Sequence, residues 1–130
     1  MSIWLDQRST VIVQGMTGSE GRKHTQRMIG AGTRVVAGVT PGKGGQSVTF
    51  EEAPVPVFDT VAEAREATGA TTSVVFVPAA YTRQAVVDAW PDVTAEVLNH
   101  LCANLHLVTG DYGQLATFDG LAAKLAELGA

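Results

Sequence analysis

One stretch near the N-terminus, residues 11–21, constrains the fold of this chain more than any other. Residues 10–14 are rich in β-branched side chains and run directly into glycines at positions 15, 18 and 21. An amphipathic run then begins at about Arg22. Because β-branched residues favour extended structure and glycines favour tight bends, the pattern predicts a strand, a tight turn and a helix.

A turn of this kind is suited to binding an anion. Glycines let a ligand approach the backbone closely, and the first amides of the following helix lack intrahelical partners. Thr17 and Ser19 add hydroxyl donors, and Ser19 is the expected helix N-cap. Glu20 would repel a phosphate, so we expect it to point away or to bind a sugar hydroxyl. The spacing G-x-x-G-x-x-G differs from the dinucleotide fingerprint G-x-G-x-x-G, so a glycine turn without a ligand stays an alternative.

A second glycine-rich segment, residues 39–45, follows the next apolar run, residues 34–39. It should also lie at the carboxyl end of a strand, which is the edge where open parallel sheets bind ligands. Lys43 is flanked by glycines and would face the first turn. We therefore predict that Lys43 is the counter-charge for a second phosphate, with a solvated surface lysine as the alternative.

The remaining pattern predicts alternating strands and helices. Strands are expected at residues 10–14, 34–39, 56–59, 73–77 and 105–110, and helices at residues 19–31, 60–68, 81–90, 94–101 and 115–128. The third strand is expected at the sheet edge because of its proline, residues 46–55 as a surface excursion, and Thr60 with Glu63 as a capping box. The prediction is an α/β, Rossmann-like, doubly wound parallel sheet of order 3-2-1-4-5, in a single domain over residues 1–130.

Composition narrows the class of protein. Of 130 residues, 45% are hydrophobic, and 13 acidic against 9 basic residues give a net charge of −4. Since no basic stripe is present, we expect neither nucleic acid nor an anionic membrane as a partner. Residues 1–6 lack a signal-peptide pattern, and a lone Cys102 fits a reducing compartment, so we expect a cytoplasmic location.

Five segments in order resemble a known family: residues 14–21, 38–45, 56–64, 67–70 and 75–79. The chain resembles the alpha subunit of succinyl-CoA synthetase (ADP- or GDP-forming), and more broadly the CoA-binding domain of acyl-CoA ligases. The likeness covers residues 1–89 well and residues 105–128 loosely. It implies that coenzyme A is the cofactor.

The resemblance also implies the binding residues. The turn at Thr17 and Lys43 would hold the phosphates, and Pro78 would lie against the adenosine portion of CoA. Asp111 stands where the family has a glutamate. The complete implied set for coenzyme A is Thr17, Gly18, Ser19, Glu20, Lys43, Pro78, Val108, Thr109 and Gly110.

The sequence departs from the family in two places. Residues 91–104 predict an additional helix where the family proceeds to its next strand. The family's second domain, which carries a phosphorylated histidine, is absent from this sequence, and His24, His100 and His106 would lie in the wrong domain to replace it. We expect His24 to be a packing or surface residue, and we expect no metal site, because His100, Cys102 and His106 lack ligand spacing.

The predicted function is a CoA-binding module that is not catalytic alone. The sequence shows no nucleophile beside a base and no carboxylate pair spaced for acid-base work. Acyl-CoA ligase (thiokinase) chemistry would need a partner chain resembling the ligase beta subunit or the C-terminal domain, and an exposed sheet edge makes a homo-oligomer an alternative assembly.

Two other functions stay open at this point. The first is an NAD(H)-binding redox-sensing or regulatory domain, although Val39 leads into Thr40 and no acidic residue ends the second strand to take a ribose diol. The second is a truncated assembly module that binds no ligand.

Overall fold

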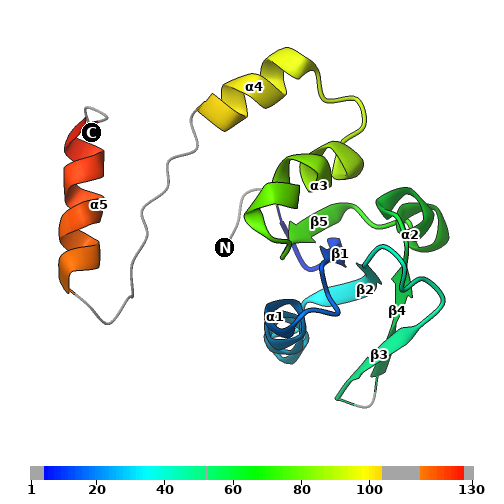
Figure 1. Ribbon diagram of the computed structural model, residues 1–130. Helices are drawn as coiled ribbons and strands as arrows, with labels where there is room; N and C mark the ends of the chain where they lie inside the picture. The colour runs from blue at the N-terminus through cyan, green and yellow to red at the C-terminus, as the bar shows by residue number, and fades with distance from the viewer. Residues whose placement is uncertain (1–4, 52, 104–114, 128–130) are drawn as a thin grey trace. The chain divides into compact units, whose positions relative to one another are not determined.

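The computed structural model describes residues 5–51, 53–103 and 115–127 of the chain (Figure 1). These residues fall into two compact units, Met1–Asp92 and Val93–Ala130, which are described separately. The first unit holds the sheet, and the second holds two helices.

The first unit is a five-stranded sheet with helices between its strands. Its strands are β1 (Thr10–Gln14), β2 (Arg34–Val39), β3 (Ser47–Phe50), β4 (Ala53–Phe58) and β5 (Thr72–Val75). Its helices are α1 (Ser19–Gly30), α2 (Val61–Thr68), the short 3-10 helix η1 (Ala79–Tyr81) and α3 (Thr82–Ala89). The predicted Rossmann-like α/β class is confirmed.

The strand order is β3-β4-β2-β1-β5, which corrects the prediction at one edge. Strands β4, β2, β1 and β5 are parallel and lie in the order predicted for the first four strands. Strand β3 was not predicted; it pairs antiparallel with β4 and occupies part of the expected surface excursion. Strand β4 is therefore not at the edge. The strand predicted over residues 105–110 lies outside the described residues.

Two prolines fit inside β4 because of the direction in which their nitrogens face. The N–H of Val57 donates to the Gln46 carbonyl at 2.8 Å, so odd-numbered amides of β4 face the β3 side. The nitrogens of Pro54 and Pro56, at even-numbered positions, face the opposite side, toward β2. Strand β2 pairs with β4 only at Val57 and Phe58, beyond both prolines. No ladder hydrogen bond is lost at either proline.

Apolar residues are buried on both faces of the sheet. On one face Val11 and Val13 pack with β3, β4 and the partly buried Met28 of α1. On the other face Ile12 packs with Val61 of α2. Successive residues of β1 thus alternate between two cores, as expected for a strand covered by helices on both sides. Figure 1 shows α1 and α2 on opposite sides of β2.

The predicted capping box of α2 is confirmed. The Glu63 N–H donates to Thr60 Oγ1 at 3.2 Å, and the Thr60 N–H donates to Glu63 Oε2 at 3.3 Å. The helix ends at Gly69, whose φ of 65° is left-handed. These local signals fix both ends of α2.

The start of α1 differs from the prediction by one residue. Its N-cap is Gly18, with φ −72° and ψ 162°, and Ser19 is the first helical residue. Because glycine has no side chain, no side-chain hydrogen bond caps this helix. The first intrahelical bond of this turn runs from the Arg22 N–H to the Gly18 carbonyl at 2.9 Å. The amides before Arg22 therefore lack an intrahelical partner.

The second unit contains α4 (Ala95–Ala103) and α5 (Leu115–Glu127), close to the two helices predicted there. The Val97 N–H donates to Thr94 Oγ1 at 3.3 Å, in the manner of an N-cap. None of the helices in the described part of the chain has the length and apolar character needed to cross a membrane.

Candidate functional site

The glycines of the first turn have different surroundings. Gly15 has φ +79°, and a Cβ placed on it would lie 2.1 Å from the Phe76 carbonyl oxygen. A Cβ on Gly21 would lie 2.1 Å from the Gly15 carbonyl oxygen. A Cβ on Gly18 would meet only the Gly15 carbonyl oxygen, at 3.4 Å. Gly15 and Gly21 therefore permit close backbone packing, whereas Gly18 leaves open space beside the turn.

The loop after β2 lies directly against this turn. The Thr17 hydroxyl donates to Thr40 Oγ1 at 3.1 Å, and the Gly15 N–H donates to the Val39 carbonyl at 2.8 Å. The Lys43 N–H donates to the Thr40 carbonyl at 3.0 Å, so Lys43 lies one turn beyond Thr40 in the same loop. The two glycine-bearing segments thus lie side by side at the carboxyl ends of β1 and β2.

A cavity of about 1020 Å³ opens at this edge, and we call it the rim pocket. Its walls come from the turn after β1, the loop after β2, the start of α2, the end of β5 and α3. Most of these residues are apolar or small. The lining is Gln14, Gly15, Thr17, Gly18, Val39, Thr40, Pro41, Gly42, Asp59, Thr60, Val61, Ala62, Phe76, Val77, Pro78, Tyr81, Gln84, Ala85, Val87, Asp88 and Pro91.

The structure brings some of the expected binding residues to the pocket and not others. The residues that line it are Thr17, Gly18 and Pro78. The side chains that do not line it belong to Ser19, Glu20 and Lys43. Those outside the described residues are Val108, Thr109 and Gly110, together with Asp111.

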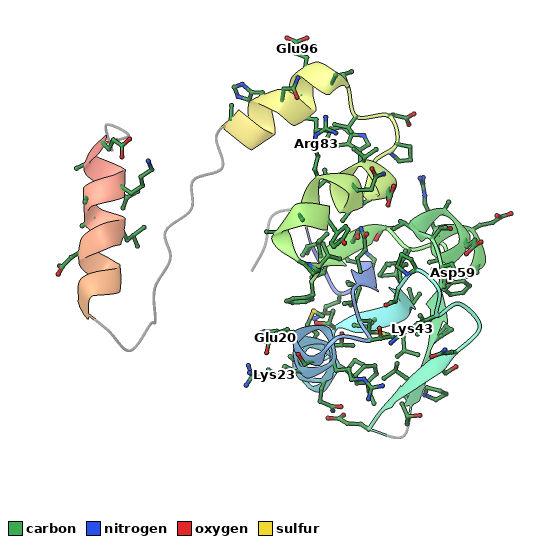
Figure 2. All side chains as sticks on the ribbon, in the orientation of Figure 1. Glu20, Lys23, Lys43, Asp59, Arg83 and Glu96 are labelled. Carbon is green, nitrogen blue, oxygen red and sulfur yellow. The ribbon has the colours of Figure 1, made fainter. Side chains whose placement is uncertain are left out.

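The Glu20 carboxylate is directed to its own helix. Its Oε2 lies 3.4 Å from His24 Nε2, and its Oε1 lies 4.0 Å from Lys23 Nζ (Figure 2). The His24 ring stacks on Phe76, with ring centroids 4.8 Å apart and planes 6° apart. His24 is a packing residue that supports Phe76, which forms part of the pocket wall.

Lys43 carries a positive charge that no carboxylate of the described residues pairs with. Lys23 and Lys124 each lie beside a carboxylate, whereas Lys43 Nζ has no hydrogen-bond or ion-pair partner among the described residues. Gly42, its neighbour in sequence, lines the rim pocket. An unpaired ammonium group beside the pocket is available to an anionic ligand.

The carboxylates in the pocket oppose anion binding. Within the described lining, no lysine, arginine or histidine balances Asp59 and Asp88. Asp59 Oδ1 accepts from the Gly44 N–H at 2.9 Å, and Asp88 Oδ1 accepts from Gln84 Nε2 at 2.7 Å. The side of the pocket at the glycine turn is therefore the less unfavourable one for an anion, and the apolar wall suits a flat, less polar group.

Asp59 and Gln14 are among the contributors to this site that were not predicted from the sequence. Asp59 directly follows β4, so the strand-end argument that identified Thr17 and Lys43 would also have found it. Gln14 is buried, and its Nε2 donates to the Ala85 carbonyl at 2.8 Å and to Ser73 Oγ at 3.0 Å. No sequence signal showed that Gln14 ties β1 to α3.

The described residues contain no group of three His, Cys, Asp or Glu side chains placed to hold a metal ion. Cys102 and His106, two of the residues considered for such a site, are not among the described side chains.

Comparisons with known proteins bear on the same segment. A family profile described as "CoA binding domain" matches residues 6–99. The succinate–CoA ligase [ADP-forming] subunit alpha of Staphylococcus aureus is 51% identical over 89 residues, covering 68% of this chain and 28% of the relative. The same-named subunit of Staphylococcus epidermidis is 43% identical over 111 residues, covering 85% of this chain and 34% of the relative.

The chain thus spans about a third or less of the length of these relatives. The matched segment, however, includes every residue that lines the rim pocket. Since the profile matches well over half of the sequence and the relatives share 43% to 51% identity with it, this chain belongs to the CoA binding domain family.

Proposed function

We propose that the chain binds coenzyme A at the rim pocket, with the phosphates held by the Thr17–Glu20 turn and Lys43. The observation that carries this proposal is the meeting of the two glycine-bearing segments, joined by the hydrogen bond between Thr17 and Thr40. That contact brings uncapped helix amides and an unpaired ammonium group to one edge of the sheet. Both are groups that bind phosphate.

Backbone amides explain how residues outside the pocket lining contribute. The Gly18 N–H already donates to the Gly15 carbonyl at 3.1 Å, so it is engaged within the turn. The amides of Ser19 and Glu20 precede the first intrahelical bond and have no side-chain cap. We propose that these amides, rather than the side chains, bind phosphate oxygens, while the Glu20 carboxylate stays on His24.

The apolar part of the pocket accounts for the rest of the nucleotide. Pro78, Val77 and Tyr81 form a wall after β5, and Tyr81 is 64% exposed. An adenine ring can pack flat against such a surface. We propose that the adenosine portion lies there and that the thiol arm leaves the pocket toward a site on another chain.

The ligase role is also a proposal. The relatives are named as subunits of a succinate–CoA ligase, and a subunit has a partner. In the described lining of the pocket, the titratable groups are Asp59, Tyr81 and Asp88, and none is paired with a histidine base. We propose that this chain supports acyl-CoA ligase chemistry only with a partner chain, and that it does so in the cytoplasm, where a lone Cys102 stays reduced.

The test is equilibrium binding of CoA, dephospho-CoA and NADH by isothermal titration calorimetry. Wild-type protein should bind CoA most tightly, and dephospho-CoA less tightly because it lacks one phosphate. Lys43→Ala should weaken CoA binding roughly tenfold, the size expected for losing a hydrogen bond to a charged group. Lys23→Ala is the matched control, since Lys23 lies on α1 beside Glu20, and it should leave binding unchanged.

Two outcomes would contradict the proposal. Preference for NADH over CoA would support a redox-sensing or regulatory domain. Failure to bind any of the three ligands would support an assembly module without a ligand.

A further inference from the structure

Asp59 presents a negative charge at a site proposed to bind phosphates. It is exposed, it lines the rim pocket, and it lies near Lys43 (Figure 2). A carboxylate in that place repels a phosphate, so its charge alone weakens binding. The hydrogen bond that its side chain accepts has the opposite effect on binding, as the next contacts show.

The Asp59 carboxylate lies against the backbone next to Lys43. Its Oδ1 accepts from the Gly44 N–H at 2.9 Å. A Cβ placed on Gly44 would lie 2.6 Å from Asp59 Oδ2 and 3.1 Å from Oδ1. Only glycine at position 44 lets the Asp59 carboxylate approach the backbone this closely.

The rest of the loop is attached to the sheet at its two ends. The Thr40 N–H donates to the Phe58 carbonyl at 3.0 Å, and the Gly45 N–H donates to the Val57 carbonyl at 3.0 Å. Between these ends the loop contains Gly42, with φ +77°, and Lys43. The Asp59 side chain supplies an attachment in the middle of the loop, one residue from Lys43.

We infer that Asp59 is a positioning residue that holds the Thr40–Gly45 loop so that Lys43 meets the ligand phosphate. This inference rests on the proposed function. The hydrogen-bond acceptor of Asp59 favours binding through the loop, while its charge opposes binding directly. The two effects can be separated, because asparagine keeps an oxygen acceptor and removes the charge.

The test compares Asp59→Ala with Asp59→Asn in the full chain, with CoA affinity measured by calorimetry. Asp59→Ala frees the loop and should weaken binding roughly two- to tenfold, the range expected for one lost hydrogen bond. Asp59→Asn should bind CoA as tightly as wild type or more tightly. Asp88→Ala is the matched control: it removes a pocket carboxylate whose hydrogen bond is to Gln84 on its own helix and not to the Thr40–Gly45 loop, so it should tighten binding slightly.

A double-mutant cycle shows whether Asp59 acts through Lys43. In the Lys43→Ala background, Asp59→Ala should cost much less affinity than it does in wild type, because the group it positions is gone. Gly44→Ala disrupts the same contact between Asp59 and Gly44 by changing the loop residue. Its Cβ would displace the carboxylate, so it should also weaken binding, and it serves as the test if Asp59→Ala does not fold.

Several results would overturn the inference. These are wild-type affinity in Asp59→Ala, weakened binding in Asp59→Asn, or an Asp59→Ala effect of equal size with and without Lys43; if Asp59→Ala does not fold, wild-type affinity in Gly44→Ala takes the place of the first. Wild-type protein that binds CoA and loses affinity in Lys43→Ala, but not in Asp59→Ala, contradicts this inference and leaves the proposed function standing. Wild-type protein that does not bind CoA contradicts both.

Discussion

At the scale of single residues, the glycines of the first turn are glycine for different reasons. Gly15 has a left-handed φ and lies against the Phe76 carbonyl, and Gly21 lies against the Gly15 carbonyl. Gly18 has an extended backbone and open space beside it. The first two should matter for folding, and Gly18 should matter for the approach of a ligand.

Gly18→Ala should therefore separate binding from stability. We expect its free energy of unfolding to stay within about 1 kcal/mol of wild type in urea denaturation, while CoA affinity falls because a methyl group enters the phosphate site. Gly15→Ala should lose roughly 2–4 kcal/mol, since it combines an unfavourable φ with a backbone clash. Wild-type CoA affinity in Gly18→Ala would mean that the phosphates bind elsewhere.

The sequence shows the turn clearly but not how its residues are used. Glycine spacing is a local pattern, so strand, turn and helix could all be predicted at residues 10–31. Which group reaches the pocket depends on partners far along the chain. The stacking of His24 on Phe76 and the bond from Gln14 to Ala85 join residues that no local pattern relates.

At the scale of elements, α2 shows how much a local signal can determine. Thr60, Glu63 and Gly69 fix its two ends through contacts within the same helix. Thr60→Ala should lower the free energy of unfolding by about 1 kcal/mol, the usual value for losing an N-cap, as measured by urea denaturation. Thr60→Ser keeps the hydroxyl acceptor and is the control. Equal loss in both variants would show that the methyl group, not the cap, stabilises α2.

Strand β3 was missed although its sequence alternates. Val48 and Phe50 are buried, while Ser47 and Thr49 are exposed, which is the period expected of a strand with one covered face. The nearby prolines of β4 favoured a loop or an edge strand instead. They fit because their nitrogens face the side where β2 has not yet begun to pair, and that depends on tertiary register.

At the scale of the whole molecule, the strand order explains where the pocket lies. From β1 the chain passes over one face through α1 to β2, and from β4 it passes over the other face through α2 to β5, on the far side of β1. The loops that follow β1 and β5 therefore diverge at their carboxyl ends, which leaves a crevice. The alternation of strands and helices was enough to predict this edge.

The balance of charge at that edge was not predicted from the sequence. Lys43 was expected there, but the carboxylates of Asp59 and Asp88 were not. Under the proposed function their charge favours phosphate binding on the side of the glycine turn. The aligned part of this chain covers only 28% to 34% of the relatives, so the ligase reaction stays a proposal. Binding of coenzyme A, in contrast, can be measured directly on this chain.

The most direct measurement is a titration of ¹⁵N-labelled protein with coenzyme A, followed by amide chemical shifts. If coenzyme A binds at the rim pocket, the largest changes should occur at Gly18, Ser19 and Glu20 and in the Gly42–Gly44 loop. Residues 31–34, at the amino end of β2, should change little. Changes concentrated at residues 31–34, or no changes at saturating coenzyme A, would contradict binding at this pocket.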